Sequence, residues 1–139
     1  MIILDTNVLS ALMQVIPDET VAKWLDRQPS DSIWITAVTL MEIRFGLHAM
    51  PPGRRRVALT NAVTELLAAK LQGRIAPFDE DAAERAAELM AVRKIKGRPV
   101  ENRDTMIAGT VLSRNASLAT RNTAHFSDLD LRLIDPWCE

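Results

Sequence analysis

Short apolar runs alternate with longer amphipathic stretches along most of this 139-residue chain. Runs rich in Ile, Leu and Val and bounded by turn-forming residues predict short buried strands. These strands are expected over residues 2–4, 32–36, 74–78, 117–120 and 131–134. Strands that alternate with helical segments are typical of an α/β protein, so we expect a parallel sheet of four to five strands flanked by helices on both faces.

The segments between the strands repeat apolar residues at helical spacing, and Pro and Gly mark their ends. Breaks fall at Pro29, at Pro51-Pro52-Gly53, at Gly73 and at Gly97. The predicted helices span residues 8–13, 17–28, 38–50, 54–71, 79–96 and 101–115. Because no repeat, low-complexity tract or linker interrupts this order, we expect residues 1–139 to form a single domain.

Polar residues follow the ends of two predicted strands. Asp5 comes directly after the first strand, and Asn122 follows the strand at 117–120. In an open parallel sheet, ligands bind beyond the carboxyl ends of the strands, so both side chains are candidates for a binding site. Asp and Asn are also common helix caps and turn residues, and the sequence leaves that alternative open.

Two acidic residues interrupt otherwise apolar helical patterns. Glu42 shares its helix face with small residues, including Val38 and Gly46, which leave room beside the carboxylate. Asp104 precedes an apolar stripe that includes Ile107. Each acid alone has a structural explanation, because a helix start stabilises Asp and a surface Glu is ordinary. Gathered with the two strand-end residues at one edge, they would form an oxygen-rich site suited to Mg²⁺ or Mn²⁺.

Composition and charge exclude several other kinds of protein. The chain is 47% hydrophobic and 25% charged, which is ordinary for a globular domain. A single Cys138 and two His residues allow neither an internal disulfide nor a Cys/His zinc site, and we therefore expect a reducing, cytoplasmic location. No apolar segment approaches the roughly 20 residues of a membrane span. The net charge of −1 gives no overall basic signature for nucleic acid.

Several motifs, in order along nearly the whole chain, resemble one known family. They are I-I-L-D-T-N-V-L-S at the start, T-A-V-T-L-M-E-I-R-F-G-L, G-R-I-A-P-F-D, R-D-T-M-I-A-G-T, L-A-T-R-N-T-A-H-F, and D-P-W near the end. Together they resemble the PIN-domain ribonucleases, and within them the VapC-type toxins of toxin-antitoxin modules, especially the FitB-like branch. The resemblance implies a three-layer α/β/α fold and a metal-dependent endoribonuclease that cleaves tRNA or rRNA and so inhibits translation and growth.

The resemblance also implies which residues form the site. The family's catalytic and metal-binding acids correspond to Asp5, Glu42 and Asp104, which would hold Mg²⁺ or Mn²⁺. Asn122 stands at a fourth position that is usually acidic, so it would bind the metal weakly, through its carbonyl oxygen or a metal-bound water, and a second metal ion would be held less tightly. Thr6 would hold Asp5 or a metal-bound water in place without binding the metal itself, or would act only in a helix cap.

Basic residues near the Asp104 helix are the candidates for RNA contact. A charge run often only solvates a helix face, so phosphate binding is one of two interpretations. The resemblance further implies a homodimer and a cognate VapB- or FitA-like antitoxin, with which the chain forms a hetero-oligomer. Operator DNA would be reached only through that antitoxin, and no membrane partner is expected. The candidate RNA contacts are Arg93, Lys94, Lys96, Arg98, Arg103 and Arg121, with Arg54, Arg55 and Arg56 as a second patch.

Two other classes of function remain open from the sequence. One is a catalytically silent scaffold that uses the same fold to bind RNA or a protein, with the acids only structural. The other is a phosphohydrolase or phosphotransferase of the haloacid-dehalogenase kind, which also places an Asp after the first strand. That class needs a second Asp two residues later, and Asn7 occupies this position. A receiver domain lacks support, since neither its acidic pair nor its phosphorylatable Asp is visible.

Overall fold

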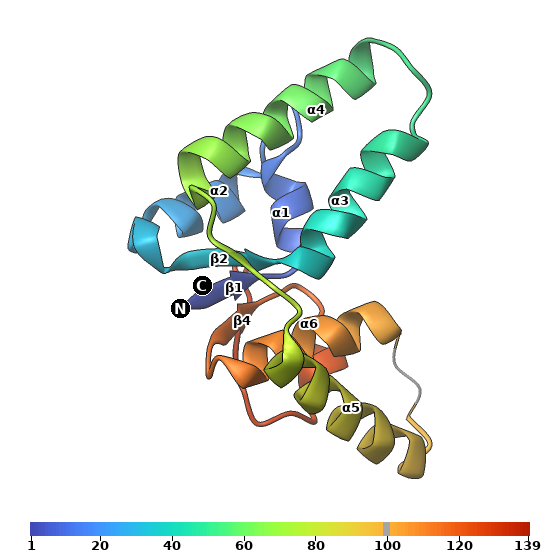
Figure 1. Cartoon of the computed structure of the whole chain (residues 1–139). Coiled ribbons are helices and arrows are strands. Elements are labelled where there is room, and N and C mark those ends of the chain that lie inside the picture. The colour runs from blue at the N-terminus through green and yellow to red at the C-terminus, as the bar shows by residue number, and fades with distance from the viewer. Residues whose placement is uncertain (99–100) are drawn as a thin grey trace.

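The strands form one parallel sheet in the computed structural model, which describes residues 1–98 and 101–139. The order across the described sheet is β3-β2-β1-β4-β5, with the three labelled strands near the middle of Figure 1. The strands are β1 (Ile2–Leu4), β2 (Ile33–Thr36), β3 (Ile75–Ala76), β4 (Ser117–Ala119) and β5 (Arg132–Ile134). Each lies within a predicted segment, so the α/β class and the parallel sheet are confirmed.

The helices also fall where apolar periodicity places them. They are α1 (Thr6–Leu12), α2 (Glu19–Asp26), α3 (Ala37–Ala49), α4 (Arg54–Leu66), α5 (Glu80–Ile95) and α6 (Asn102–Ser113). A π-helical turn, η2 (Leu67–Leu71), completes the predicted helix at 54–71, whereas the short 3₁₀ turns η1 (Ser30–Ser32) and η3 (Thr123–Phe126) were not predicted. None of the helices described is both long and apolar enough to cross a membrane.

Helices cover both faces of the sheet. Figure 1 shows α1 to α4 on one side and α5 with α6 on the other. Two apolar clusters fill the two interfaces: Trp24 and Val63 belong to the first, and Ile107 and Phe126 to the second. In β1, Leu4 joins the first cluster and Ile3 the second, because successive side chains of a strand point to opposite faces. The predicted three-layer α/β/α arrangement is therefore confirmed.

The strand order places a topological switch point at the carboxyl edge of the sheet, between β1 and β4. From β1 the chain adds β2 and β3 on one side and later β4 and β5 on the other. In other open α/β sheets, ligands bind at this point, beyond the carboxyl ends of the strands. Leu4 pairs with Ala119, and the Asp5 amide donates to the Ala119 carbonyl at 2.8 Å, so these two strands end level with each other.

Candidate active site

Asp5 lies directly after β1 at this edge of the sheet and is only 4% exposed. It follows β1 in an extended conformation, and its Oδ1 accepts a hydrogen bond from the Thr6 amide at 2.8 Å. This contact caps α1, which is why the helix begins at Thr6, two residues earlier than its apolar pattern predicts. The capping interpretation and the site interpretation of Asp5 are thus compatible, because Oδ2 faces a different set of groups.

Two neighbours orient the second Asp5 oxygen. The Thr120 hydroxyl donates to Asp5 Oδ2 at 2.8 Å, and the Asn7 amide nitrogen lies 3.4 Å from the same atom. Asn7 also donates to Thr120 Oγ1 at 3.2 Å and accepts from the Arg121 amide at 3.1 Å, which ties the loop after β1 to the loop after β4. Sequence reasoning did not identify these roles of Asn7 and Thr120. The only signal available was their position at or just beyond the ends of two predicted strands.

The surroundings of Asp5 disfavour its negative charge. Burial raises the pKa of its carboxyl, and the charge of Asp104 raises it further. Hydrogen bonds from Thr120 and Thr6, together with the nearby His125, lower the pKa and only partly compensate. A buried carboxylate in this setting gains stability from an added cation.

Glu42 approaches the site from α3. The Thr6 hydroxyl donates to Glu42 Oε1 at 3.1 Å and lies 3.1 Å from the Thr39 hydroxyl. Thr6 was predicted to support Asp5 or a metal-bound water. Its amide does contact Asp5, but its hydroxyl contacts Glu42. Burial raises the pKa of the Glu42 carboxyl, and the charge of Asp5 adds to this effect, whereas Thr6 and Arg103 oppose it.

Asp104 enters from the first turn of α6 and faces the η3 turn. The Nδ1 atom of His125 lies 3.4 Å from Asp104 Oδ2. The residue before Asp104 also reaches the site, since Arg103 Nη1 lies 3.8 Å from Glu42 Oε2 while its Nε donates to Glu101. A basic or imidazole group therefore stands against two of the three acids. No role was predicted for His125, which the sequence shows only within the L-A-T-R-N-T-A-H-F motif.

The three acids have the chemistry that a divalent cation requires, but their spacing in this structure does not form a metal-binding group. Carboxylate oxygens are the ligands that Mg²⁺ and Mn²⁺ prefer, and the charges of neighbouring acids raise the pKa values of Asp5 and Glu42. Across residues 1–98 and 101–139, however, no group of three or more His, Cys, Asp and Glu side chains is spaced closely enough to hold a metal ion. Arg103 and His125 contact the acids instead.

Asn122 lies at the same edge, but on its surface. Its backbone amide donates to the Thr120 hydroxyl at 3.0 Å, and its carbonyl accepts from the His125 amide at 3.0 Å. The residue is exposed and begins the η3 turn without a side-chain cap. The structure therefore places the backbone of Asn122 beside the groups that orient Asp5, in an exposed position.

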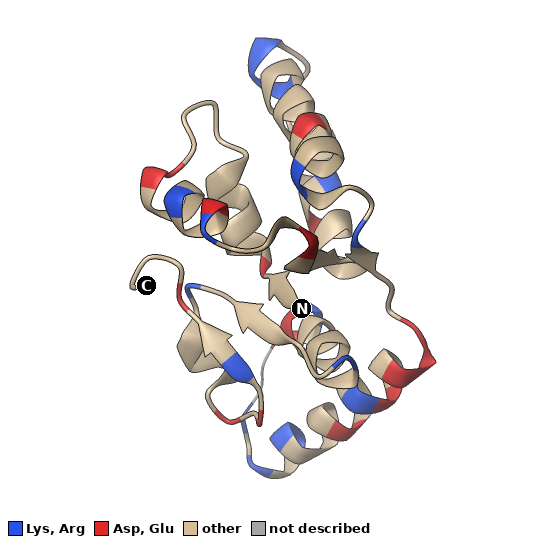
Figure 2. Ribbon diagram, turned by 90° about the vertical axis from the view of Figure 1, so that its left-hand side faces the viewer, with Lys and Arg blue, Asp and Glu red and all other residues tan. Residues whose placement is uncertain are grey.

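The six predicted RNA contacts have different environments. Arg93 is 2% exposed and bonded within the protein, so the prediction that it contacts RNA directly is wrong for this conformation. Arg98 donates to the Ala124 carbonyl at 2.8 Å, and the Arg121 guanidinium lies 4.7 Å from the centre of the Trp137 ring. Lys94 and Lys96 are exposed at the end of α5. Figure 2 shows basic and acidic residues mixed along α5 rather than one basic face.

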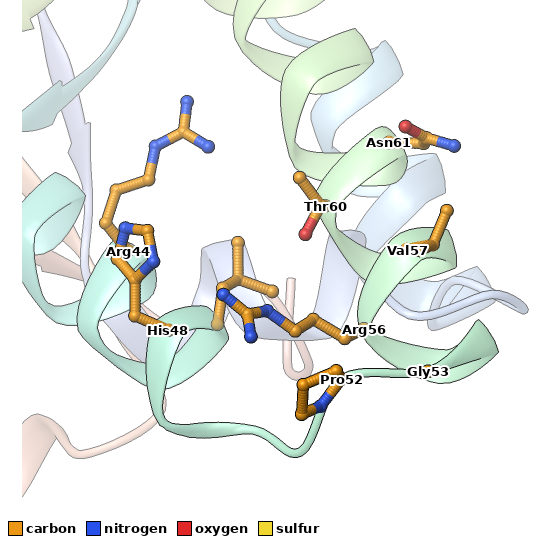
Figure 3. A pocket seen from close by; sticks show the side chains of 9 residues that line it. Arg44, His48, Pro52, Gly53, Arg56, Val57, Thr60 and Asn61 are labelled. Atoms are coloured by element: carbon orange, nitrogen blue, oxygen red, sulfur yellow. The ribbon is translucent and has the colours of Figure 1, made fainter.

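A separate basic cavity of 360 Å³ lies between α3 and α4. Figure 3 shows Arg44 and His48 on α3, with Arg56 extending toward them from α4. Among the described residues that line this cavity, none is acidic. Of the second basic patch in the sequence, Arg56 alone lines the cavity, and its Nη1 also donates to the Met50 carbonyl at 3.4 Å.

Comparison with known proteins matches this chain to a family model described as PIN domain over residues 2–131. The chain is 41% identical over 137 residues to the VapC ribonuclease Y4jK of Sinorhizobium fredii, covering 99% of this chain and 98% of that protein. It is 32% identical over 137 residues to the toxin FitB of Neisseria gonorrhoeae, covering 99% of each. A chain in the structure of FitAB bound to an IR36 DNA fragment superposes with a TM-score of 0.87 at 32% identity, covering 99% of this chain and 96% of that chain.

Proposed function

This chain belongs to the PIN-domain family, and on that premise we propose that it is a Mg²⁺- or Mn²⁺-dependent endoribonuclease that acts as the toxin of a toxin-antitoxin module. The observation that carries the proposal is that Asp5, Glu42 and Asp104 come from three elements to the carboxyl edge of the sheet, where burial and the charges of neighbouring acids raise the pKa of Asp5 and Glu42. The relatives named VapC ribonuclease and toxin FitB, similar over almost their whole length, support the activity and the role.

The roles of the side chains follow from their contacts. Asp5, Glu42 and Asp104 would hold the metal, with Asn122 as a weak further ligand through its carbonyl oxygen or a water. When bound, the metal would lower the pKa of a coordinated water and neutralise charge that develops on the scissile phosphate. Thr120 and Asn7 orient the Asp5 carboxylate, and Thr6 orients Glu42. Such outer partners typically affect metal affinity or activity about 10- to 100-fold.

Arg103 would contact both an acid of the site and the RNA. Its side chain is 46% exposed and lies near the Glu42 carboxylate. A bound cation would replace that positive charge, which would free the guanidinium to contact an RNA phosphate. Arg103 would thus be an RNA-contact residue, as predicted from the sequence, and would also limit repulsion between the acids before the metal binds.

Metal dependence is the experiment that tests the proposed function. Cleavage of cellular RNA by the purified protein should require Mg²⁺ or Mn²⁺ and stop when EDTA is added.

The stability of the metal-free protein should also depend on pH. Because the folded-state pKa values of Asp5 and Glu42 are raised, the folded metal-free protein binds more protons than the unfolded chain. Its stability should therefore fall as pH rises from about 4 through those raised values. Near pH 7, metal at 100 times its Kd should restore about 2.7 kcal/mol, visible as a higher melting temperature.

A silent scaffold is the alternative, and the lack of a ready-made metal-binding group in the described residues favours it. RNA binding that needs no metal and produces no cleavage, together with a melting temperature that metal does not change, would support the scaffold and reject the nuclease.

The exposed basic residues at the end of α5 are the proposed contacts for RNA phosphates. Replacing Lys94 and Lys96 by Ala should weaken RNA binding evenly across sequences. It should also make the slope of log K against log salt shallower by about 0.7 for each phosphate that the variant no longer neutralises. Filter binding at several salt concentrations measures this slope. Lys23→Ala on α2, where an exposed pair with Glu19 is removed, is the control; an equal change in that variant would contradict a local contact.

We also propose a homodimer and an antitoxin partner, with DNA reached only through that partner. The neighbouring structure is named as FitAB bound to a DNA fragment, and this chain resembles it over nearly its full length. Large apolar side chains that a partner would cover are exposed on several helices. They are Met41 and Phe45 on α3, Val57 on α4, and Met90, Val92 and Ile95 on α5.

Co-expression with the protein of the adjacent small reading frame, followed by light scattering, tests the homodimer and the antitoxin partner. A purified monomer that retains no co-expressed protein would contradict both.

A further inference from the structure

Arg93 is a buried arginine whose guanidinium joins three elements. It projects from the last turn of α5, and its Nε and Nη2 each lie 3.2 Å from the Asp128 carboxylate. Its Nη2 also donates to the His125 carbonyl at 2.9 Å, and its Nη1 donates to the Thr105 hydroxyl at 3.2 Å. One side chain therefore connects α5 to α6 and to the η3 turn.

Both ends of this connection lie beside Asp104. Thr105 directly follows Asp104 on α6, and His125 places its imidazole 3.4 Å from the Asp104 carboxylate. Asn122 is tied to His125 through their backbone hydrogen bond. Movement of η3 away from α6 would therefore move His125 and Asn122 away from Asp104 together.

The chemistry of the contact fits positioning better than simple stabilisation. Removing a charge pair from water costs much of what the pair returns, and well-packed apolar residues of similar size are often equally stabilising. A planar guanidinium, by contrast, donates in several fixed directions at once. Arg93 uses these directions for a carboxylate, a hydroxyl and a carbonyl on two separate elements.

We propose that Arg93, through Asp128, Thr105 and the His125 carbonyl, is a positioning residue that fixes η3 against α6 beside Asp104. This inference rests on the proposed metal-dependent cleavage. Arg98 adds a weaker contact, since its Nη1 lies 3.9 Å from Asp128 and its Nη2 donates to Ala124. Arg93 nonetheless alone reaches both Thr105 and η3 among the contacts described.

The test is Arg93→Lys, which retains the positive charge facing Asp128 but replaces the planar guanidinium by a compact ammonium that cannot span Asp128, Thr105 and the His125 carbonyl together. We expect a folded protein whose half-maximal Mn²⁺ concentration for cleavage rises about 10- to 100-fold. Free Mn²⁺ measured by electron paramagnetic resonance should show the same loss of affinity without RNA, and amide exchange should increase over residues 122–128. Arg85→Lys on the same helix is the control, because Arg85 forms an exposed pair with Glu88 and should change none of these quantities.

A merely structural role gives a different result. If Arg93→Lys lowers the melting temperature but leaves Mn²⁺ affinity and amide exchange in η3 at the wild-type values, the proposal is overturned. Should this variant fail to fold, Asp128→Asn decides by the same three measurements. Failure of the proposed function is recognised separately, because then the wild-type protein itself neither binds Mn²⁺ nor cleaves RNA.

Discussion

Replacement of Asp5 by Asn should abolish RNA cleavage and growth arrest while leaving the protein folded. The change removes the charge of a proposed metal ligand but keeps a side chain of almost the same shape. Metal-ion catalysis is worth several kcal/mol, and each 1.36 kcal/mol is tenfold in rate, so we expect a loss of about 10³-fold or more. Gel assays of cleaved RNA and growth curves after brief induction measure the two effects.

The stability of Asp5→Asn, unlike its activity, should be retained or increased. Burial and the charge of Asp104 raise the pKa of Asp5, which means that the ionised carboxylate costs free energy in the metal-free fold. Above the raised pKa this cost is fully present, so Asp5→Asn should melt at or above the wild-type temperature near pH 7. Metal should raise the wild-type melting temperature and leave that of the variant unchanged.

The control for this experiment is Asp31→Asn, which changes an exposed acid in η1. It should cleave RNA at the wild-type rate. Full activity of Asp5→Asn would remove Asp5 from the active site, whereas loss of activity with a collapsed melting temperature would show that the fold itself depends on the Asp5 carboxylate.

The order of elements was predictable because local patterns determine it. Ile2, Ile3 and Leu4 form a run that can be buried on both faces, and the structure places Ile3 and Leu4 in different clusters. Apolar periodicity predicts α3 and α6 to within a residue or two, and thereby places Glu42 and Asp104 on these helices. The η3 turn was not predicted, since neither strand nor helix periodicity marks it.

The contacts that organise the site join residues far apart in the sequence, and a single sequence does not show them. Thr6 donates to Glu42, 36 residues later, and Thr120 donates to Asp5 across 115 residues. Arg93 is the clearest case. A cation in the last turn of a helix is favoured by the dipole and is usually exposed, so surface contact with RNA was the natural prediction. Its burial follows from Asp128, which the fold brings beside it.

Gly109 should be the glycine whose replacement destabilises the protein most. A Cβ at this position would lie 2.7 Å from the Ala82 carbonyl oxygen and 2.8 Å from the Ala86 nitrogen, both backbone atoms of α5. Because backbone cannot rotate aside, Gly109→Ala must push α6 from α5. Overpacking of this kind costs about 1–3 kcal/mol and sometimes more, which exceeds the gain of about 1 kcal/mol in helix propensity.

Gly46→Ala is the matched control, since Gly46 is also helical and, among the described residues outside its own stretch of helix, no heavy atom lies within 4 Å of an added Cβ. That variant should gain up to about 1 kcal/mol from its lower unfolded-state entropy. Urea denaturation should therefore shift the two midpoints in opposite directions, and equal midpoints would contradict the close packing of α5 on α6. Because Asp104 lies in the first turn of the helix that contains Gly109, the folded fraction of Gly109→Ala should also show weaker Mn²⁺-dependent cleavage than Gly46→Ala. The close approach of two helix backbones would then set the position of the proposed catalytic carboxylate five residues away.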